Sequence, residues 1–426
     1  MGGEWVEVRI KDIVTVVGGS TPSTKDALNF GGDIPWLTPK DLSGTHPRYV
    51  SRGNRNLSLK GLHRCSATLL PKNTVLLTTR APIGYVALSA NPIATNQGFR
   101  SLIVKPEFDH EFLYYWLKVN KTKLERHASG STFKELSGTA LKNIAIRLPT
   151  SKAEQRAIAH ILGSLDDKIE LNRQMAQTLE SIARAIFKSW FVDFDPVKAK
   201  MEGKQPEGMT EEIAALFPDR LVDSELGMIP EGWSPIPLSK MANFLNGLAL
   251  QKYPPIGKDD LPVLKIAQLR SGKLDYDKLA SNEISDKYLV SEGDLIFSWS
   301  GSLIVDVWAG PKCALNQHLF KVTPEKWATK GLLWVAIHEH IDNFRAIAAA
   351  KAVTMGHIKR SHLNEAMVIL PSIEKVQNIS GVLDILIQGS TTLKAESNTL
   401  INLRDTLLPQ LISSKIRLNQ PEDAAA

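Results

Sequence analysis

The chain has 426 residues, of which 43% are apolar and 23% are charged. This length is too great for one hydrophobic core and predicts two to three domains, and the composition is that of an ordinary soluble globular protein. The sequence has no apolar run near the length of a membrane span and no signal-peptide pattern at its N-terminus, so we expect a cytoplasmic protein.

The net charge of +6 is distributed unevenly along the chain. Residues 1–150 contain 20 Lys and Arg against 11 Asp and Glu, a net charge of +9, whereas residues 151–230 have a net charge of −4. Residues 231–371 have a net charge of +2. A basic domain is the electrostatic footprint of a protein that binds a polyanion.

Residues 1–149 alternate short apolar runs with turns rich in Gly, Pro, Asn and Ser. The run at residues 74–79 predicts a strand, and residues 111–125 predict an amphipathic helix. We interpret residues 1–149 as a first mixed globule of the α+β class.

Residues 150–195 predict a long helix. Ser151 is placed to cap its N-terminus, and Glu154, three residues later, is placed to complete a capping box. One face of the helix repeats at intervals of seven residues, with the members Ile158, Leu165, Asn172, Leu179 and Ile186.

Residues 196–229 are rich in Pro, Gly and acidic residues and predict a linker. Residues 230–371 repeat the pattern of the first globule, with a strand expected at 294–298 and a helix at 330–349. Residues 372–414 predict a second long helix, which Pro409 should end or kink, and we expect residues 415–426 to be a flexible tail. The heptad positions of this second helix are all leucine: Leu386, Leu393, Leu400 and Leu407.

Repeats of seven residues over four to five heptads favour helices that supercoil around each other. We expect the two long helices to pair as a coiled coil, with Asn172 meeting a Leu-rich face and fixing the register. The alternative is that each helix packs only on its own globule.

Several strings occur twice, about 220 residues apart. Ala94-Thr95-Asn96-Gln97 returns as Ala314-Leu315-Asn316-Gln317, and Asp33-Ile34-Pro35 returns as Asp260-Leu261-Pro262. Residues 144–149 likewise resemble residues 366–371. Two similar units in one chain give an internal pseudo-symmetry that suits a two-part target or two copies of one partner.

The sequence contains none of the usual catalytic machinery. It has no phosphate-binding Gly-rich loop followed by Lys and Ser or Thr. Asp193 and Asp195 are interpreted as a solvated helix end, and residues 338–340 as a surface cluster without the spacing of a zinc hydrolase. We therefore expect no catalytic residue, no metal site and no cofactor bound by this chain. The two cysteines, Cys65 and Cys313, are expected to be free thiols.

The turns of each globule contain side chains suited to DNA. Arg can hold guanine by two hydrogen bonds and Asn or Gln can hold adenine, whereas Lys, Ser and Thr more often contact phosphates. In the first globule the candidates are Ser20, Thr21, Lys40, Arg80, Asn96, Gln97, Arg100, Ser131, Thr132 and Lys134. In the second they are Asn246, Lys265, Gln268, Arg270, Trp299, Asn316, Gln317, His318, Lys351, Thr354 and His357. Because Asn-Gln occurs in both copies, a structural role for these pairs is as plausible as a role in DNA contact.

The order globule, long helix, globule, long helix resembles the specificity subunit of type I DNA restriction–modification enzymes. Two strings support the resemblance most specifically, residues 191–197 (Phe-Val-Asp-Phe-Asp-Pro-Val) and residues 223–233 (Asp-Ser-Glu-Leu-Gly-Met-Ile-Pro-Glu-Gly-Trp). The second helix departs from the pattern, because Lys375-Val376-Gln377-Asn378 stands where the first helix has its Glu-Gln-Arg string.

The resemblance implies two pseudo-symmetric α/β target recognition domains separated by two long antiparallel helices that form a coiled-coil spacer. Each domain would read one half of a bipartite site in double-stranded DNA. Two modification (methyltransferase) subunits would bring S-adenosylmethionine, and two restriction subunits would bring ATP, Mg and cleavage. This chain would supply specificity alone.

Two alternatives remain open at this point. The chain could be a non-catalytic scaffold that bridges two identical proteins, in which case it would not bind duplex DNA in a salt-dependent way. It could also be a self-contained methyltransferase, which the missing catalytic loops argue against.

Overall fold

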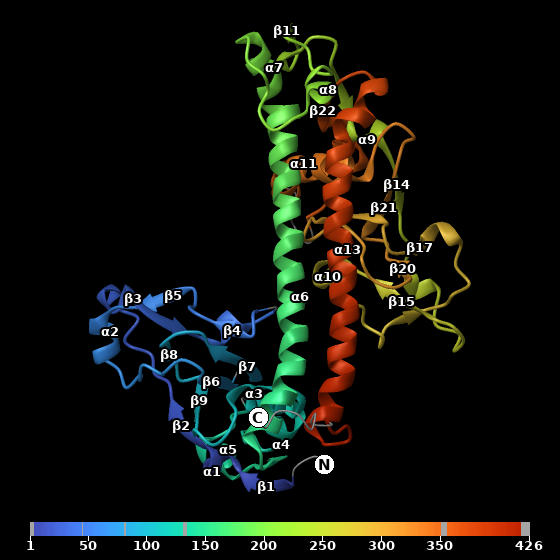
Figure 1. Cartoon of the computed structure of the whole chain (residues 1–426). Helices are drawn as coiled ribbons and strands as arrows, with labels where there is room; N and C mark the ends of the chain where they lie inside the picture. The colour runs from blue at the N-terminus through green and yellow to red at the C-terminus, as the bar shows by residue number, and fades with distance from the viewer. Residues whose placement is uncertain (1–3, 45, 81, 131–133, 351–355, 419–426) are drawn as a thin grey trace, which may run out of the picture. The chain divides into compact units, whose positions relative to one another are not determined.

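The computed structural model describes residues 4–44, 46–80, 82–130, 134–350 and 356–418. The chain divides into two compact units: unit 1 comprises residues 1–170 and 400–426, and unit 2 comprises residues 171–399. Each unit therefore contains one globule together with parts of both long helices (Figure 1).

Unit 1 is built on a five-stranded sheet in the order β2-β9-β6-β7-β4. The predicted strand at 74–79 is confirmed as β6, and all of its residues are buried. A second sheet has the order β5-β3-β8, with β3 and β8 parallel, and β1 pairs with β10. The strands are β1 (Trp5–Arg9), β2 (Val14–Gly18), β3 (Phe30–Leu37), β4 (Tyr49–Val50), β5 (Arg55–Leu57), β6 (Val75–Thr79), β7 (Ile83–Ser89), β8 (Ala94–Thr95), β9 (Phe99–Val104) and β10 (Ala145–Pro149).

The helix predicted at 111–125 is two helices, α3 (His110–Val119) and α4 (Lys121–Arg126). The Asn120 side chain donates to the carbonyl of Trp116, a local side-chain bond that competes with helix continuation. Asp109 caps α3 by accepting from Phe112 N at 2.9 Å. The shorter helices of unit 1 are α1 (Ile10–Ile13), α2 (Leu59–His63) and α5 (Gly138–Asn143), with 3-10 turns η1 (Ala27–Asn29) and η2 (Pro39–Leu42).

Unit 2 repeats this plan. Its four-stranded sheet has the order β14-β21-β18-β19, matching β2-β9-β6-β7, and its parallel pair β15/β20 matches β3/β8. The strand expected at 294–298 is confirmed as β18. The strands are β13 (Ser234–Pro237), β14 (Ala242–Asn246), β15 (Leu261–Leu264), β16 (Leu279–Ala280), β17 (Leu289–Val290), β18 (Leu295–Ser298), β19 (Val305–Val307), β20 (Cys313–Leu315), β21 (Leu319–Pro324) and β22 (Met367–Leu370).

The helix predicted at 330–349 is confirmed as α11 (Lys330–Ala350). His338 on this helix is not the surface group expected from the sequence. Its ring lies 4.1 Å from that of Trp334, and burial, assisted by the charge of Arg184, lowers the pKa of His338 to about 4. The shorter helices of unit 2 are α9 (Leu238–Met241), α10 (Ile266–Ser271) and α12 (Arg360–Glu365), with 3-10 turns η4 (Leu250–Lys252) and η5 (Asp286–Tyr288). Both cysteines are free thiols, as expected.

The segment predicted as a linker, residues 196–229, is folded. It contains α7 (Asp195–Met201), α8 (Glu211–Ala214) and the hairpin of β11 (Leu221–Ser224) and β12 (Gly227–Pro230). Aromatic rings hold it to the end of the first long helix, since Phe217 packs edge-on against Trp190 and lies 5.7 Å from the ring of Trp233. The Pro and Gly content marked turns within a folded segment.

The first long helix is α6 (Lys152–Phe187), followed by a π-helical turn η3 (Lys188–Val192). Ser151 Oγ accepts from Glu154 N at 3.4 Å, as the capping box predicts, and Glu154 Oε1 also accepts from the Trp5 indole at 3.2 Å. After the turn, Asp193 pairs with Lys188 and Asp195 accepts from Ser189. Among the described residues no cluster of three or more His, Cys, Asp or Glu could hold a metal ion.

The second long helix is α13 (Ile373–Ile412). It does not end at Pro409, because the missing N–H and the ring affect only the last turn, and the Pro409 carbonyl still accepts from Ser413 N. No helix of the described residues is long and apolar enough to cross a membrane.

Within each unit the two long helices pair antiparallel (Figure 1). In unit 2, Asn172 contacts Glu396 and Glu180 contacts Ser390, and in unit 1 Asp166 contacts Arg404. From one pair to the next the residue number rises along α6 and falls along α13, which defines the antiparallel arrangement. The ends of the helices also pack on the globules, so both expected modes of packing occur.

The predicted heptad positions lie along these contacts. Ile158 and Asn172 are fully buried, and the others are half-buried: Leu165, Leu179, Ile186, Leu386, Leu393, Leu400 and Leu407. Ile186 and Leu386 pack against the core of unit 2, and Leu407 packs against that of unit 1. The polar residues Ser390 and Arg404 take the places between them.

Asn172 has a polar partner on the second long helix, Glu396, which the sequence does not single out. Asn172 is 0% exposed and its Nδ2 donates to Glu396 Oε2 at 3.0 Å, whereas its Oδ1 is buried without a hydrogen-bond partner. An unsatisfied buried acceptor costs about 1–3 kcal/mol. Asn172 therefore destabilises the helix pair and favours one register.

Asn172→Leu should stabilise unit 2 by about 1–2 kcal/mol, because it removes a buried acceptor and adds apolar surface to the seam. Unfolding in urea, monitored by hydrogen exchange of the amide protons in α6, would measure the gain in the free energy of unfolding. Leu179→Asn is the matched control and should destabilise the same transition. A loss of stability in Asn172→Leu would show that the Glu396 bond outweighs the unpaired oxygen.

Candidate nucleic-acid interface

In both units most of the predicted DNA-contacting side chains lie around one loop, residues 96–98 in unit 1 and 316–318 in unit 2. Each loop joins the short parallel strand to the inner strand of the main sheet, β8 to β9 and β20 to β21. The backbone bonds that frame it are equivalent in the two units. In unit 1 they are Asn96 N to Leu37 O, Phe99 N to Asn96 O, Thr79 N to Gly98 O and Leu136 N to Thr79 O; in unit 2 they are Asn316 N to Leu264 O, Leu319 N to Asn316 O, Trp299 N to His318 O and Ile358 N to Trp299 O.

The two repeated asparagines tie this loop to itself. Asn96 Oδ1 accepts from Gly98 N at 2.9 Å, and Asn316 Oδ1 accepts from His318 N at 3.3 Å. Such a bond to the backbone two residues on is a local turn motif. It supports the structural role that a motif present in both copies suggested, and DNA contact by these two residues remains a prediction.

A glycine packs against the same loop in each unit. A Cβ at Gly19 would lie 2.1 Å from Asn96 O, and one at Gly247 would lie 2.3 Å from Asn316 O. No side chain fits at such distances, so the loop and the end of the edge strand must approach backbone to backbone. This requirement holds the loop in the same place in both units.

In unit 1 two predicted arginines share one carboxylate. Glu135 Oε1 lies 3.3 Å from Arg80 Nη2 and 3.7 Å from Arg100 Nη2. The side chain of Arg80 is 43% exposed and that of Arg100 is 23% exposed. The three residues, which we call the arginine cluster, have a net charge of +1 and hold both guanidinium groups beside the loop.

Glu135 was not among the residues singled out from the sequence. It directly follows the predicted DNA-contacting residues Ser131, Thr132 and Lys134 in the sequence. Its position directly after these residues is a local sign in the sequence. The structure shows why the position matters, because the backbone of Glu135 forms a β-bridge with that of Arg80.

The remaining candidates of unit 1 come from separate segments of the domain. Thr21 Oγ1 is hydrogen-bonded to Gln97 Oε1, and the Ser20 carbonyl accepts from the Trp36 indole at 3.2 Å. Lys40 is exposed on η2, which Pro39 brings against Gly98. Lys134 is exposed beside Glu135, and Ser131 and Thr132 lie outside the described residues.

In unit 2 the corresponding place is occupied by aromatic and imidazole rings. Ser300 stands where unit 1 has Arg80, and its Oγ is 3.0 Å from His318 Nδ1. Trp299 lies 5.8 Å from the ring of His318 and 6.1 Å from that of His357, and its indole donates to Gln317 O. Trp299, Gln317, His318 and His357 are thus brought together, in a cluster suited to contact a base by its face or by hydrogen bonds.

The segment containing Lys265, Gln268 and Arg270 was expected to be a loop but forms α10. Ile266 on this helix lies close to Gly301, which places the helix next to the aromatic cluster. Lys265 and Arg270 are exposed, and Gln268 has a buried Oε1 without a partner. Lys351 and Thr354 lie outside the described residues.

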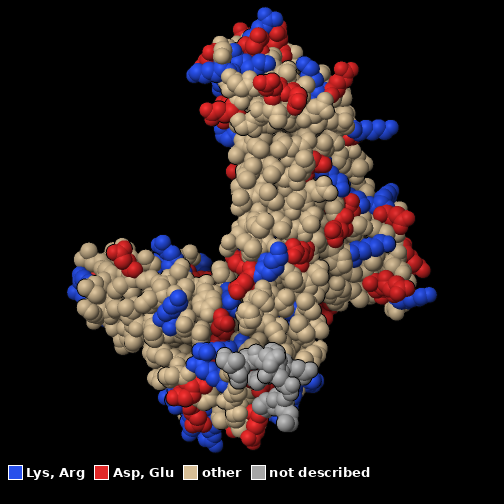
Figure 2. All heavy atoms as spheres, in the orientation of Figure 1, with Lys and Arg blue, Asp and Glu red and all other residues tan. Residues whose placement is uncertain are grey.

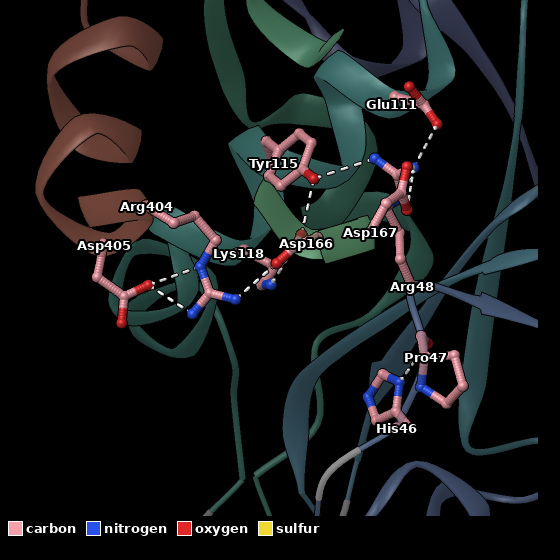
Figure 3. Close-up of polar contacts among 10 residues, drawn as sticks. All are labelled: His46, Pro47, Arg48, Glu111, Tyr115, Lys118, Asp166, Asp167, Arg404 and Asp405. Atoms are coloured by element: carbon pink, nitrogen blue, oxygen red, sulfur yellow. Dashed lines mark hydrogen bonds and ion pairs between the residues drawn. The ribbon is translucent and has the colours of Figure 1, made fainter. Parts of the chain in front are cut away.

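A second polar cluster ties the globule of unit 1 to both long helices (Figure 3). Arg48 Nη2 is 2.9 Å from Asp167 on α6, and its Nη1 donates to the Tyr115 hydroxyl. Asp166 on the same helix accepts from Tyr115 at 2.7 Å and from Arg404 of α13 at 2.6 Å. No periodic pattern predicts these residues, because the partners come from four separate segments of the chain.

Asp166 is charged in this cluster despite its burial. Burial opposes the charged form, but Lys118 and Arg404 outweigh it and hold the pKa of Asp166 below its ordinary value. Removing either partner would leave a buried charge, so the cluster specifies how α6, α13 and α3 meet within unit 1.

The comparisons with known proteins agree with this geometry. The family model described as type I restriction modification DNA specificity domain matches residues 2–181 and 230–403, one match for each globule and its helix. The chain belongs to this family. Its members are the DNA-recognition components of type I systems and are not themselves catalytic.

Individual relatives cover most of the chain. The MjaIX specificity subunit of Methanocaldococcus jannaschii is 34% identical over 98% of this chain and 94% of its own length. The HindI specificity subunit of Haemophilus influenzae is 25% identical over 72% of this chain and 77% of its own. The crystal structure of a type I restriction–modification S subunit from M. genitalium has the same fold, with a TM-score of 0.55, 18% identity and coverage of 98% of this chain and 97% of that chain.

Glu135→Gln should raise the affinity of the specificity subunit for duplex DNA of any sequence and steepen its salt dependence, because the arginine cluster would gain one unit of positive charge. Anisotropy titrations with a duplex of random sequence at several salt concentrations would measure both effects, and an increase of about threefold to tenfold at low salt is expected. Glu125→Gln, which removes an exposed carboxylate paired with Lys121 elsewhere in unit 1, is the control. Equal effects of the two variants would remove the arginine cluster from the DNA-binding face.

Proposed function

We propose that each recognition domain reads one half of a bipartite target in double-stranded DNA and that the two long helices set the gap between the halves. The observation that supports this most directly is the pair of equivalent loop frames that hold different side chains. The frame is common to residues 96–98 and 316–318, whereas the arginine cluster of unit 1 is replaced by rings in unit 2. Two readers of one construction but different chemistry fit an asymmetric site.

The domain boundaries belong to this proposal. They are residues 1–149 and 230–371 for the recognition domains, 150–195 and 372–414 for the spacer helices, 196–229 for the segment between them and 415–426 for the tail. The strands β10 and β22 end at Pro149 and Leu370, directly before the long helices begin. That coincidence supports a change from reader to spacer at these points.

The catalytic steps fall to other subunits in this proposal. Type I specificity implies DNA, a modification subunit and a restriction subunit as partners. We propose two copies of each, with S-adenosylmethionine on the modification subunits and ATP and Mg on the restriction subunits. A cytoplasmic location, where such subunits meet DNA, is part of the same proposal.

A stripe of exposed apolar residues on α6 supports docking of a modification subunit on the helices. Leu171, Met175 and Ile182 are 50%, 45% and 42% exposed and lie on one face of the helix. The surface over this part of α6 shows few charged groups (Figure 2). Apolar residues exposed side by side are typical of a protein–protein interface.

The reading of separate halves can be tested with one arginine from each domain. Arg80→Ala should relax recognition at one half of the site and Arg270→Ala at the other, because each lost base contact removes about 1–3 kcal/mol of discrimination. Long-read mapping of methylated adenines, in cells that contain each variant with its modification subunit, would show the recognised sequence. The gap in the mapped site would measure the spacer.

Both halves should never change together in this experiment. A variant that alters both halves would contradict two independent readers. Arg220→Ala, at an exposed arginine of unit 2 that pairs with Glu231 and lies outside residues 230–371, is the control and should leave the map unchanged.

The docking stripe gives a second test. Met175→Glu combined with Ile182→Glu should weaken binding of the modification subunit at least tenfold, because charges would replace apolar contacts at the interface. Co-purification and titration of the two subunits would measure the loss. Gln177→Glu, an exposed residue outside the stripe, is the control, and unchanged binding in the double variant would place the partner elsewhere.

A further inference from the structure

The two units align in register at the end of the edge strand beside the site. Gly18 of β2 pairs with Arg100 of β9, and Asn246 of β14 pairs with Phe320 of β21. The short helix that follows the site starts at Gly138 in unit 1 and at Arg360 in unit 2. The three equivalent positions are therefore Gly, Arg and Gly in unit 1 and Asn, Phe and Arg in unit 2.

In unit 1 the guanidinium group comes from the strand. A Cβ at Gly18 would lie 3.5 Å from Arg100 Nη1, and one at Gly138 would lie 3.4 Å from Arg100 Nε. Arg100 thus lies between the edge strand and the start of α5. The absence of a side chain at Gly138 leaves the room that the arginine occupies.

In unit 2 the guanidinium group comes from the helix and reaches the same place from the other side. Arg360 Nη2 donates to Phe244 O at 2.8 Å and to Asn246 Oδ1 at 3.3 Å. Its guanidinium carbon lies 5.8 Å from the centre of the Phe320 ring. Phe320 stands at the position of Arg100, so an aromatic ring supports the arginine that replaces it.

The exchange conserves charge as well as place. Positions 80, 100, 135 and 138 of unit 1 are Arg, Arg, Glu and Gly, with a net charge of +1. The equivalent positions 300, 320, 357 and 360 of unit 2 are Ser, Phe, His and Arg, which also total +1 with the imidazole neutral. One positive charge beside the loop is therefore common to the two units, although no arginine occupies the same sequence position in both.

We infer that Arg360 is a DNA-contacting residue of the second recognition domain and the spatial counterpart of Arg100. This inference rests on the proposed function. The described contacts of Arg360 both use Nη2, so Nη1 and Nε keep their N–H groups for a ligand, and the residue is exposed. The ligand is a guanine edge, which a guanidinium binds by two bonds, or a backbone phosphate in the second half-site.

The test uses the complete specificity subunit with its modification partner and duplexes that contain the mapped site. One duplex has the second half-site scrambled and another has the first half-site scrambled. If Arg360 contacts a base, Arg360→Ala should weaken binding to the intact site about tenfold and leave binding to the duplex that retains only the first half-site unchanged; if it contacts a phosphate, the loss should be the same on every duplex. Arg220→Ala is the matched control.

The double variant Phe320→Arg with Arg360→Gly separates contact from folding. It rebuilds the unit 1 arrangement in unit 2, and it should recover most of the affinity that Arg360→Ala loses. A purely structural role for Arg360 predicts no recovery, because the new arginine cannot bond Phe244 O from the helix. Thermal melting of each variant shows whether unit 2 is folded.

The outcomes divide as follows. An equal loss on every duplex in a folded variant, with a salt slope lower by about one, identifies a phosphate contact, and a loss confined to duplexes that retain the second half-site identifies a guanine contact; either supports the inference. Wild-type affinity in Arg360→Ala, or no recovery of affinity in the folded double variant, would overturn it. Failure of the proposed function is a different outcome. In that case the wild-type specificity subunit itself would show no preference for the mapped site over the scrambled duplexes.

Discussion

The backbone bonds around residues 96–98 and 316–318 are the constraint on which the two recognition domains depend. The same amides and carbonyls pair in both units, and the same close approach at Gly19 and Gly247 holds the loop against the edge strand. Because these bonds involve the backbone, they do not restrict most of the neighbouring side chains. The domain can therefore change its surface chemistry while the frame stays in place.

The pairing of the long helices follows a different logic. Apolar residues bury the ends of α6 and α13 against the globules, whereas polar groups specify how they meet: Asn172 with Glu396, Glu180 with Ser390, and Asp166 with Arg404. Buried polar contacts of this kind contribute little net stability, but a wrong register would leave them unpaired. The polar contacts of the helix pair thus specify its register and add little to its stability.

Much of this architecture could be predicted from the sequence. The repeated strings, the heptads and the strand β6 can each be recognised from the sequence alone, and these features are where expected. The features that were missed depend on contacts between distant segments. Glu135 bridging two arginines, the folded segment at 196–229 and Glu396 opposite Asn172 have no local pattern. Arg360 shows the limit most clearly. When the two units are aligned with each other, Arg360 pairs with Gly138, and only the structure shows that its guanidinium group lies at the place that Arg100 occupies in unit 1.

Unit 1 is assembled from the two ends of the chain, which has a consequence for its biosynthesis. Its core includes Leu408, Leu411 and Ile412, which pack with Ile158 and Leu162 although some 250 residues separate them in the chain. A ribosome that has just released the first globule has not yet made the residues that cover this apolar face. The domain synthesised first therefore completes its core last, and its apolar face stays uncovered until the final helix emerges.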